Sequence, residues 1–316
     1  MRGFVANTDY DWFTFLRSIE PPIDEVNFWR PGSESSFKAL QPGEPFFFKL
    51  KAPRNAIGGF GYFAHYSSLP VSMAWDVYRE ANGAPSYRSM RERLLSIRSR
   101  FQMDTDPKAD FTIGCILVNQ PLFFGEDDWI GTPKDFAGPI VQGKSYDLTQ
   151  GEGERIWLEC LARAGAQRGT SSRDLAIGDR PISSGYGAPI STRPRLGQRS
   201  FRIVILDSYQ RRCAVTNERT LPALEAAHIR EYHEVPEHSI NNGILFRADI
   251  HKLFDTGYVT VTPDYHFEVS RQIKEEFENG RDYYKLHGTE IRLPTDPAHH
   301  PLVEALSWHN EQRYLG

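Results

Sequence analysis

Two histidines and an asparagine in the last third of the chain have types and spacing suited to hydrolytic chemistry. His228 ends a short apolar run, Asn242 follows 14 positions later, and His251 follows after nine more. An imidazole has an ordinary pKa of about 6.5, so it can take a proton from water near neutral pH. Imidazole can also hold a divalent metal ion, and an amide can fix a loop. One such histidine would more often be structural, but the three together favour a centre for phosphodiester hydrolysis.

Short elements with clear patterns must bring these three side chains to one point. Residues 224–229 form an apolar run typical of a strand, and residues 242–254 include a stretch with helical spacing around His251. A further strand is predicted at residues 257–261. The predicted helices of this part cover residues 201–209, 273–279 and 301–314. A strand, a loop and a helix in this order can make the three side chains converge.

The segment from residue 195 to residue 261 resembles the HNH endonuclease domain of the kind found in modification-dependent restriction enzymes. The matching motifs are RLGQ at 195–198, RCAVT at 212–216, LEAAHI at 224–229, NGIL at 242–245 and DIHKLFD at 249–255. The resemblance implies a ββα-metal nuclease that hydrolyses double-stranded DNA with a divalent metal ion, Mg²⁺ or Mn²⁺. It also implies that His228 is the general base, that Asn242 organises the loop and that His251 is a metal ligand.

The position before the expected base departs from the common HNH pattern. Many HNH enzymes carry an aspartate there as a second metal ligand, and here the residue is Ala227. Glu225 lies two positions earlier on the same expected strand, and Asp249 lies two positions before His251. Either carboxylate could compensate, or water could complete the coordination shell.

Positive charge is concentrated in the middle of the chain. The formal net charge of the whole chain is −4, but residues 166–220 hold ten arginines, no lysine and four acidic residues. Guanidinium groups bind phosphates well, although basic linkers are also common. We expect Arg195, Arg211 and Arg212, which belong to this arginine-rich stretch, to contact DNA phosphates.

Composition predicts two α+β domains joined by a linker. The chain has 316 residues, of which 40% are hydrophobic, enough for two cores. Residues 166–198 are dense in Gly, Ser, Pro and Arg and predict a linker between a first domain at 1–165 and an HNH domain at 199–316. Three well-separated cysteines, no apolar leader and no membrane-length apolar run favour a cytoplasmic protein without a membrane partner.

The first 165 residues alternate strand-like and helix-like stretches. The expected strands cover residues 44–50, 56–65 and 111–118, and the expected helices cover residues 70–79 and 86–100. Glycines inside the second of these strands predict a curved sheet or an open β-barrel. An NFWRP segment at 27–31, a Pro-Gly turn into an aromatic strand and then this glycine-rich strand together resemble the PUA superfamily, which includes EVE, YTH and SRA-type domains.

The PUA resemblance implies a domain that reads DNA by flipping a modified base into an aromatic pocket. A flipped base is held by stacking on aromatic faces and by hydrogen bonds to its edge. Trp29, Phe60, Tyr62 and Trp75 are the candidate walls of such a pocket, and each of them would equally suit an ordinary core.

Three functions are therefore weighed from the sequence. The leading prediction is a modification-dependent, metal-requiring DNA endonuclease. The alternatives are an HNH restriction endonuclease that reads unmodified sequence, and a DNA-binding module whose nuclease centre has decayed. Because one HNH centre cuts one strand at a time, a homodimer is a further prediction.

Overall fold

A computed structural model describes the chain except for residues 107, 137–139, 141, 170–196 and 231–238. The chain divides into two units, Met1–Pro194 and Arg195–Gly316. Most of the expected linker at 166–198 lies outside the described residues, but both of its ends are helical. Helix α4 (Gly151–Gly169) extends past the expected boundary at residue 165, and helix α5 (Gln198–Ser208) begins at the last residue of the expected linker.

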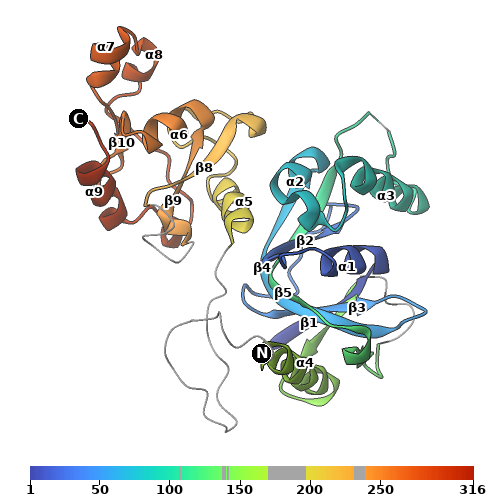
Figure 1. The fold of residues 1–316 in the computed structure, drawn as a ribbon. Coiled ribbons are helices and arrows are strands. Elements are labelled where there is room, and N and C mark those ends of the chain that lie inside the picture. The colour runs from blue at the N-terminus through green and yellow to red at the C-terminus, as the bar shows by residue number, and fades with distance from the viewer. Residues whose placement is uncertain (107, 137–139, 141, 170–196, 231–238) are drawn as a thin grey trace. The chain divides into compact units, whose positions relative to one another are not determined.

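A mixed β-sheet forms the centre of the N-terminal unit (Figure 1). Within the described residues it has seven strands in the order β2-β5-β4-β3-β1-β7, with β6 paired to β4. The strands are β1 (Arg2–Thr8), β2 (Glu25–Arg30), β3 (Pro45–Leu50), β4 (Ala56–Pro70), β5 (Thr112–Phe123), β6 (Ile130–Gly131) and β7 (Gly143–Asp147). β1 and β3 run parallel, and the other pairs are antiparallel. The strands expected from the aromatic and β-branched runs correspond to β3, β4 and β5.

Glycines in β4 allow the sheet to bend where β4 meets β5. A Cβ atom on Gly59 would lie 2.1 Å from the carbonyl oxygen of Leu122, and one on Gly61 would lie 2.5 Å from Val118. The strand register shifts between Phe60 and Tyr62, as in a β-bulge. The expectation that glycine permits close backbone approach in this strand is therefore confirmed.

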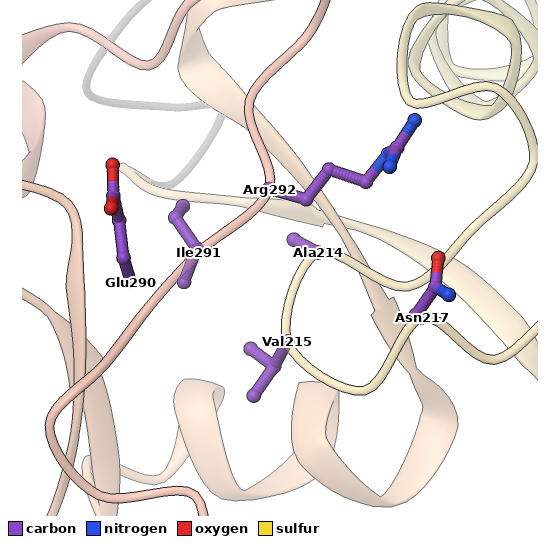
Figure 2. A pocket seen from close by; sticks show the side chains of 6 residues that line it. All are labelled: Ala214, Val215, Asn217, Glu290, Ile291 and Arg292. Carbon is purple, nitrogen blue, oxygen red and sulfur yellow. The ribbon is translucent and has the colours of Figure 1, made fainter.

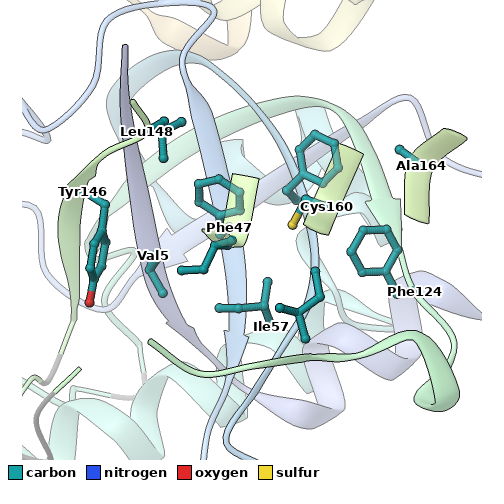
Figure 3. Packing of buried hydrophobic residues seen from close by; sticks show 11 residues of the cluster. Val5, Phe47, Ile57, Phe124, Tyr146, Leu148, Cys160 and Ala164 are labelled. Atoms are coloured by element: carbon teal, nitrogen blue, oxygen red, sulfur yellow. The ribbon is translucent and has the colours of Figure 1, made fainter. Parts of the chain in front are cut away.

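The helices of the N-terminal unit pack on this sheet, and α4 covers one of its faces. They are α1 (Tyr10–Arg17), α2 (Val71–Tyr78), α3 (Tyr87–Arg100) and α4. Ile156, Cys160 and Ala164 of α4 join Phe47 of β3 and Phe124, which directly follows β5, in one buried cluster (Figure 3). Because α4 supplies part of this core, the first domain must include this helix at least as far as Ala164.

The C-terminal unit contains a hairpin followed by a helix, the ββα order that the HNH resemblance predicts (Figure 1). Its strands are β8 (Leu224–His228), β9 (Gly243–Arg247), β10 (Val259–Val261), β11 (His266–Val269) and β12 (Thr289–Glu290). Its helices are α5, α6 (Ala248–Asp255), α7 (Gln272–Phe277), α8 (Arg281–Tyr284) and α9 (Val303–Gln312). The predicted mixed α+β class is confirmed. Among the described residues, no helix is long and apolar enough to cross a membrane.

Short 3-10 turns complete both units. They lie at Arg79–Asn82, Glu126–Asp128, Leu221–Ala223, Ile240–Asn242 and Pro297–His299. The turn at Ile240–Asn242 leads directly into β9 and ends on the candidate asparagine. The backbone of Asn242 is therefore held at the start of the hairpin's second strand.

Candidate active site in the C-terminal unit

The β8–β9 hairpin and α6 position the three residues that the sequence singled out. His228 is the last residue of β8 and pairs across the hairpin with Gly243, the first residue of β9. Asn242 immediately precedes β9, and His251 lies in the middle of α6. Helix α6 buries Ile250 and Phe254, which are four residues apart and therefore share one face of the helix.

The imidazole of His228 is stacked on an aromatic ring from α5. The ring centroids of His228 and Phe201 lie 4.0 Å apart with an interplanar angle of 10°. Phe201 is itself 1% exposed, so its ring is fixed by the surrounding core. The fixed ring of Phe201 restricts rotation of the His228 imidazole. It also covers one face of the imidazole, so the edge of the imidazole is left to meet substrate.

Gly243 leaves the space that Phe201 occupies. A Cβ atom at position 243 would lie 2.5 Å from Cδ1 of Ile205 and 2.6 Å from Cζ of Phe201. We predict that Gly243→Ala lowers the free energy of unfolding by about 1–3 kcal/mol through overpacking and displaces Phe201 from His228. Chemical denaturation measures this loss. Gly131→Ala, where an added Cβ meets nothing within 4 Å, is the control, and equal stability of the two variants would contradict the prediction.

Asn242 joins the two ends of the loop between β8 and β9. Its side-chain oxygen accepts a hydrogen bond of 3.0 Å from the backbone N–H of Arg230, and its Nδ2 donates one of 3.0 Å to the carbonyl of Arg230. The backbone N–H of Ile229 donates to the carbonyl of Asn242 at 3.0 Å. The amide side chain is 3% exposed. This geometry suits the predicted role of Asn242 in organising the loop that follows His228.

His251 lies between two carboxylates. Its Nδ1 is 2.7 Å from Oε2 of Glu225 on β8, and its Nε2 is 3.4 Å from Oδ2 of Asp255, one helical turn further along α6. Burial by itself would lower the pKa of His251, but the hydrogen bonds to Asp255 and Glu225 outweigh it, so that the pKa is raised above its usual value. The two carboxylates make the surroundings of this ring negative, and a divalent cation that coordinates the ring would have to displace its proton.

Of the two carboxylates proposed to replace the missing aspartate, the structure places Glu225 near His251. Side chains two apart on a strand share a face, so Glu225 points to the same side of β8 as the fully buried Ala227. Asp249 is engaged elsewhere: it accepts hydrogen bonds from Arg247 at 2.8 and 2.5 Å and from the hydroxyl of Tyr283 at 3.2 Å.

The donor set around His251 fits a metal ion held by one imidazole and one carboxylate. Glu225 and Asp255 face different ring nitrogens, so a single ion could not contact both carboxylates and the ring. The described part of the chain contains no group of three or more His, Cys, Asp or Glu side chains arranged to hold a metal. The second carboxylate could still orient the ring by accepting its N–H, as carboxylates commonly do for metal-bound histidines.

The three arginines expected to bind phosphates have different surroundings. Arg195 lies outside the described residues. Arg211 forms an ion pair with Asp207, with Nε 3.2 Å from Oδ1. Arg212 donates a hydrogen bond of 3.0 Å to the side-chain oxygen of Asn217. Arg211 is thus paired with a carboxylate, whereas Arg212 donates to an uncharged amide.

Two of the four aromatic residues expected to line a base pocket are buried. Phe60 is 1% exposed and belongs to the core cluster beneath α4, so its face is not accessible to a base. Trp29 is 8% exposed, and its Nε1 donates to the carbonyl of Asn82 at 2.8 Å. Tyr62 is partly buried against Phe60, whereas Trp75 on α2 is partly buried near Tyr87. For Phe60 and Trp29 the structure favours the core role.

Two residues near the centre were not singled out from the sequence. Asp255 lies four positions after His251, and this spacing on a helix could have identified it. Phe201 gives no comparable local signal, because its contact with His228 spans 27 positions and depends on how α5 packs. Cys213, expected to be a core residue, is fully buried.

Comparison with known proteins identifies the class of the C-terminal unit. Residues 213–262 match the family model for HNH endonucleases, and these residues contain His228, Asn242 and His251. The C-terminal unit thus contains an HNH endonuclease domain, as predicted. No curated protein sequence matches the chain.

Among solved structures, the chain is similar to an ASCH protein and to a restriction endonuclease. One single-residue mutant of ZmASCH from Zymomonas mobilis has 11% sequence identity and a TM-score of 0.30, over 49% of this chain and 96% of that chain. A second mutant of the same protein has 12% identity and a TM-score of 0.31, over 49% and 94%. The modification-dependent TagI restriction endonuclease has 12% identity and a TM-score of 0.28, over 99% of this chain and 81% of that chain.

Proposed function

We propose that this protein is a metal-dependent DNA endonuclease whose N-terminal unit selects modified DNA. The observation that supports the nuclease assignment is the placement of His228, Asn242 and His251 on the β8–β9 hairpin and α6, within residues that match the HNH family. The same three residues argue against a decayed DNA-binding module, and Glu225 beside His251 supplies the carboxylate that Ala227 lacks.

In the proposed reaction, His228 takes a proton from the attacking water at an imidazole nitrogen. Stacking on Phe201 holds the ring, and the bonds between Asn242 and Arg230 hold the chain that leaves β8. These contacts set the direction of the base before substrate arrives, which reduces the entropic cost of reaching the transition state.

The metal ion would be held by His251 together with Glu225 or Asp255. A bound Mg²⁺ or Mn²⁺ would stabilise negative charge on the scissile phosphate and on the leaving oxygen. His251 is anchored on α6 by the buried Ile250 and Phe254, so its ring is presented to the hairpin from a rigid element. Side chains alternate along a strand, so His228 and Glu225 point to opposite faces of β8. We infer that the scissile phosphate approaches the end of β8, where groups on both faces of the strand can reach it.

Target selection is assigned to the N-terminal unit because an HNH centre alone has little means to read a base. A panel of plasmids that carry methylated cytosine, hydroxymethylated cytosine, phosphorothioate linkages or no modification tests this proposal, with Mg²⁺, with Mn²⁺ and with chelator. Cleavage of a single modified class supports the reader role. Equal cleavage of all plasmids at defined sites supports the alternative, a restriction enzyme that reads unmodified sequence. Cleavage of both strands by paired chains stays a prediction.

The N-terminal unit should fold and bind DNA without the nuclease unit, provided that α4 is kept whole. We predict that a fragment of residues 1–169 is soluble and binds one class of modified duplex at least tenfold more tightly than bare duplex, a difference of about 1.4 kcal/mol. Fluorescence anisotropy measures both affinities. A second fragment that ends at residue 155 lacks Ile156, Cys160 and Ala164 of the core and should be unstable. Equal binding of both duplexes by the folded fragment would reject the reader role.

A further inference from the structure

Three arginines gather around a surface pocket of the C-terminal unit, although Arg292 is 80 positions from Arg212 in the sequence. The pocket has a volume of about 300 Å³ and lies between the turn after α5 and the segment that follows β12 (Figure 2). It is lined by Ala214, Val215, Asn217, Glu290, Ile291 and Arg292. Arg212 reaches this site through its hydrogen bond to Asn217, and Arg219 lies two positions beyond that asparagine.

The backbone holds the two sides of the pocket together. The N–H of Arg292 donates to the carbonyl of Ala214 at 2.7 Å, and Nη2 of Arg292 donates to the side-chain oxygen of Gln210 at 2.5 Å. The side-chain partners of Arg212 and Arg292 are thus amides. Within the described residues, none of the guanidinium groups of Arg212, Arg219 and Arg292 forms an ion pair.

Two carboxylates, those of Glu218 and Glu290, lie near the three guanidinium groups. The carboxylate of Glu218 accepts hydrogen bonds of 2.8 Å from the backbone N–H groups of Arg219 and Thr220, and one of 2.6 Å from the hydroxyl of Thr220. Figure 2 shows Glu290 across the pocket from Asn217 and from the side chain of Arg292. Three guanidinium groups against two carboxylates leave the cluster with a net charge of +1.

The three guanidinium groups repel one another, and a bound anion would offset this repulsion. The pKa of Arg212 is lowered by its removal from water and by the charges of Arg219 and Arg292. Like charges held together repel one another, and a bound phosphate would reverse the sign of that interaction. Arginine also matches the geometry of phosphate oxygens with paired donors.

The pocket lies beside the hairpin that carries the candidate base. The N–H of Ala214 donates to the carbonyl of Leu245 on β9 at 2.7 Å, on the edge of β9 that does not pair with β8. The backbone of Ala214, at the edge of the pocket, is thus about two strand spacings, roughly 10 Å, from β8. A pocket at this separation from the hairpin strand that carries His228 suits a phosphate that neighbours the scissile one in the same duplex.

We propose that Arg212, Arg219 and Arg292 bind a backbone phosphate of the substrate DNA that flanks the scissile one. The proposal rests on the DNA endonuclease function proposed above and adds Arg219 and Arg292 to its binding surface. The contact is to the phosphate alone, so it strengthens binding to all DNA sequences and modifications alike.

DNA binding at several salt concentrations tests the site. The full-length His228→Ala protein, which binds without cutting, is compared with the same protein carrying Arg212→Gln, Arg219→Gln and Arg292→Gln, by anisotropy of a labelled duplex. The triple change should weaken binding about tenfold or more at low salt, and the slope of log affinity against log salt should fall by about one for each phosphate that the protein no longer neutralises. Arg271→Gln, at an exposed arginine of the same unit, is the matched control and should leave the slope unchanged. Glu290→Gln should strengthen binding.

The outcomes separate this site from the proposed function. If the His228→Ala protein binds DNA and the folded triple variant binds it with the same affinity and slope, the site is wrong and the endonuclease proposal stands. If the His228→Ala protein has no affinity for DNA, both are wrong. If inorganic phosphate raises the melting temperature only when the three arginines are present, while DNA binding does not depend on them, the pocket binds a small anion and the DNA assignment is overturned. Should the triple variant not fold, Arg219→Gln alone, at an exposed side chain, should still weaken binding at low salt and lower the slope, and an unchanged affinity and slope would reject the site.

Discussion

Replacing His228 by alanine should reduce DNA cleavage by about 10²–10⁴-fold or more while leaving DNA affinity nearly unchanged. A general base acts on the proton of water in the transition state, so its loss lowers the rate of the chemical step rather than ground-state binding. The variant should also stay folded, since removal of a half-buried ring that stacks on Phe201 exposes part of one aromatic face. Single-turnover cleavage of a supercoiled plasmid measures the rate, and anisotropy measures binding.

A histidine elsewhere in the same unit serves as the control for this change. His266 on β11 has a side chain 43% exposed, and His266→Ala should cut at the wild-type rate. Cleavage by His228→Ala at that same rate would reject the base assignment. A large loss of activity in Phe201→Leu with unchanged DNA affinity would show that the stacked ring positions the base.

The second large effect concerns the metal requirement. His251→Ala should abolish cleavage or raise the metal concentration for half-maximal cutting by at least tenfold, because it removes the one imidazole between Glu225 and Asp255. Glu225→Gln should raise the same concentration by several-fold, since an amide keeps the shape of the side chain but loses its charge. Cleavage rates over a range of Mg²⁺ and Mn²⁺ concentrations measure both shifts. Because the site has few protein ligands, chelator should stop cutting without unfolding the protein.

A variant at Asp249 shows how the loss of a structural carboxylate differs from the loss of one that binds metal. Asp249→Asn removes the charge that pairs with Arg247, so it should lower stability and leave the metal requirement of the folded enzyme unchanged. Glu275→Gln, at an exposed position on α7, should change neither quantity. If His251→Ala cuts normally at low metal concentration, or if wild-type cutting survives exhaustive chelation, His251 is a packing residue of α6 and the metal proposal is wrong.

The local features of the nuclease unit could be predicted from sequence because they depend on neighbouring residues. The apolar run before His228, the Asn-Gly at 242–243 and the helical spacing around His251 each specify an element, and their order is that of a ββα hairpin and helix. The glycines of β4 could be interpreted in the same way, since close backbone approach excludes any larger residue there. The motifs that contain these residues resemble those of HNH endonucleases, and this resemblance indicated the family.

The partners of individual side chains could not be predicted, because they depend on strand register and on helix packing between distant segments. From the sequence, either Glu225 or Asp249 could contact His251. In the structure Glu225 of β8 contacts His251, whereas Asp249 accepts hydrogen bonds from Arg247. An aromatic residue such as Phe60 suits a pocket wall as well as a core, and Phe60 is a core residue because α4 packs over it. The arginine cluster likewise exists only because the chain after β12 returns to the turn that follows α5, which brings charges far apart in sequence to one pocket.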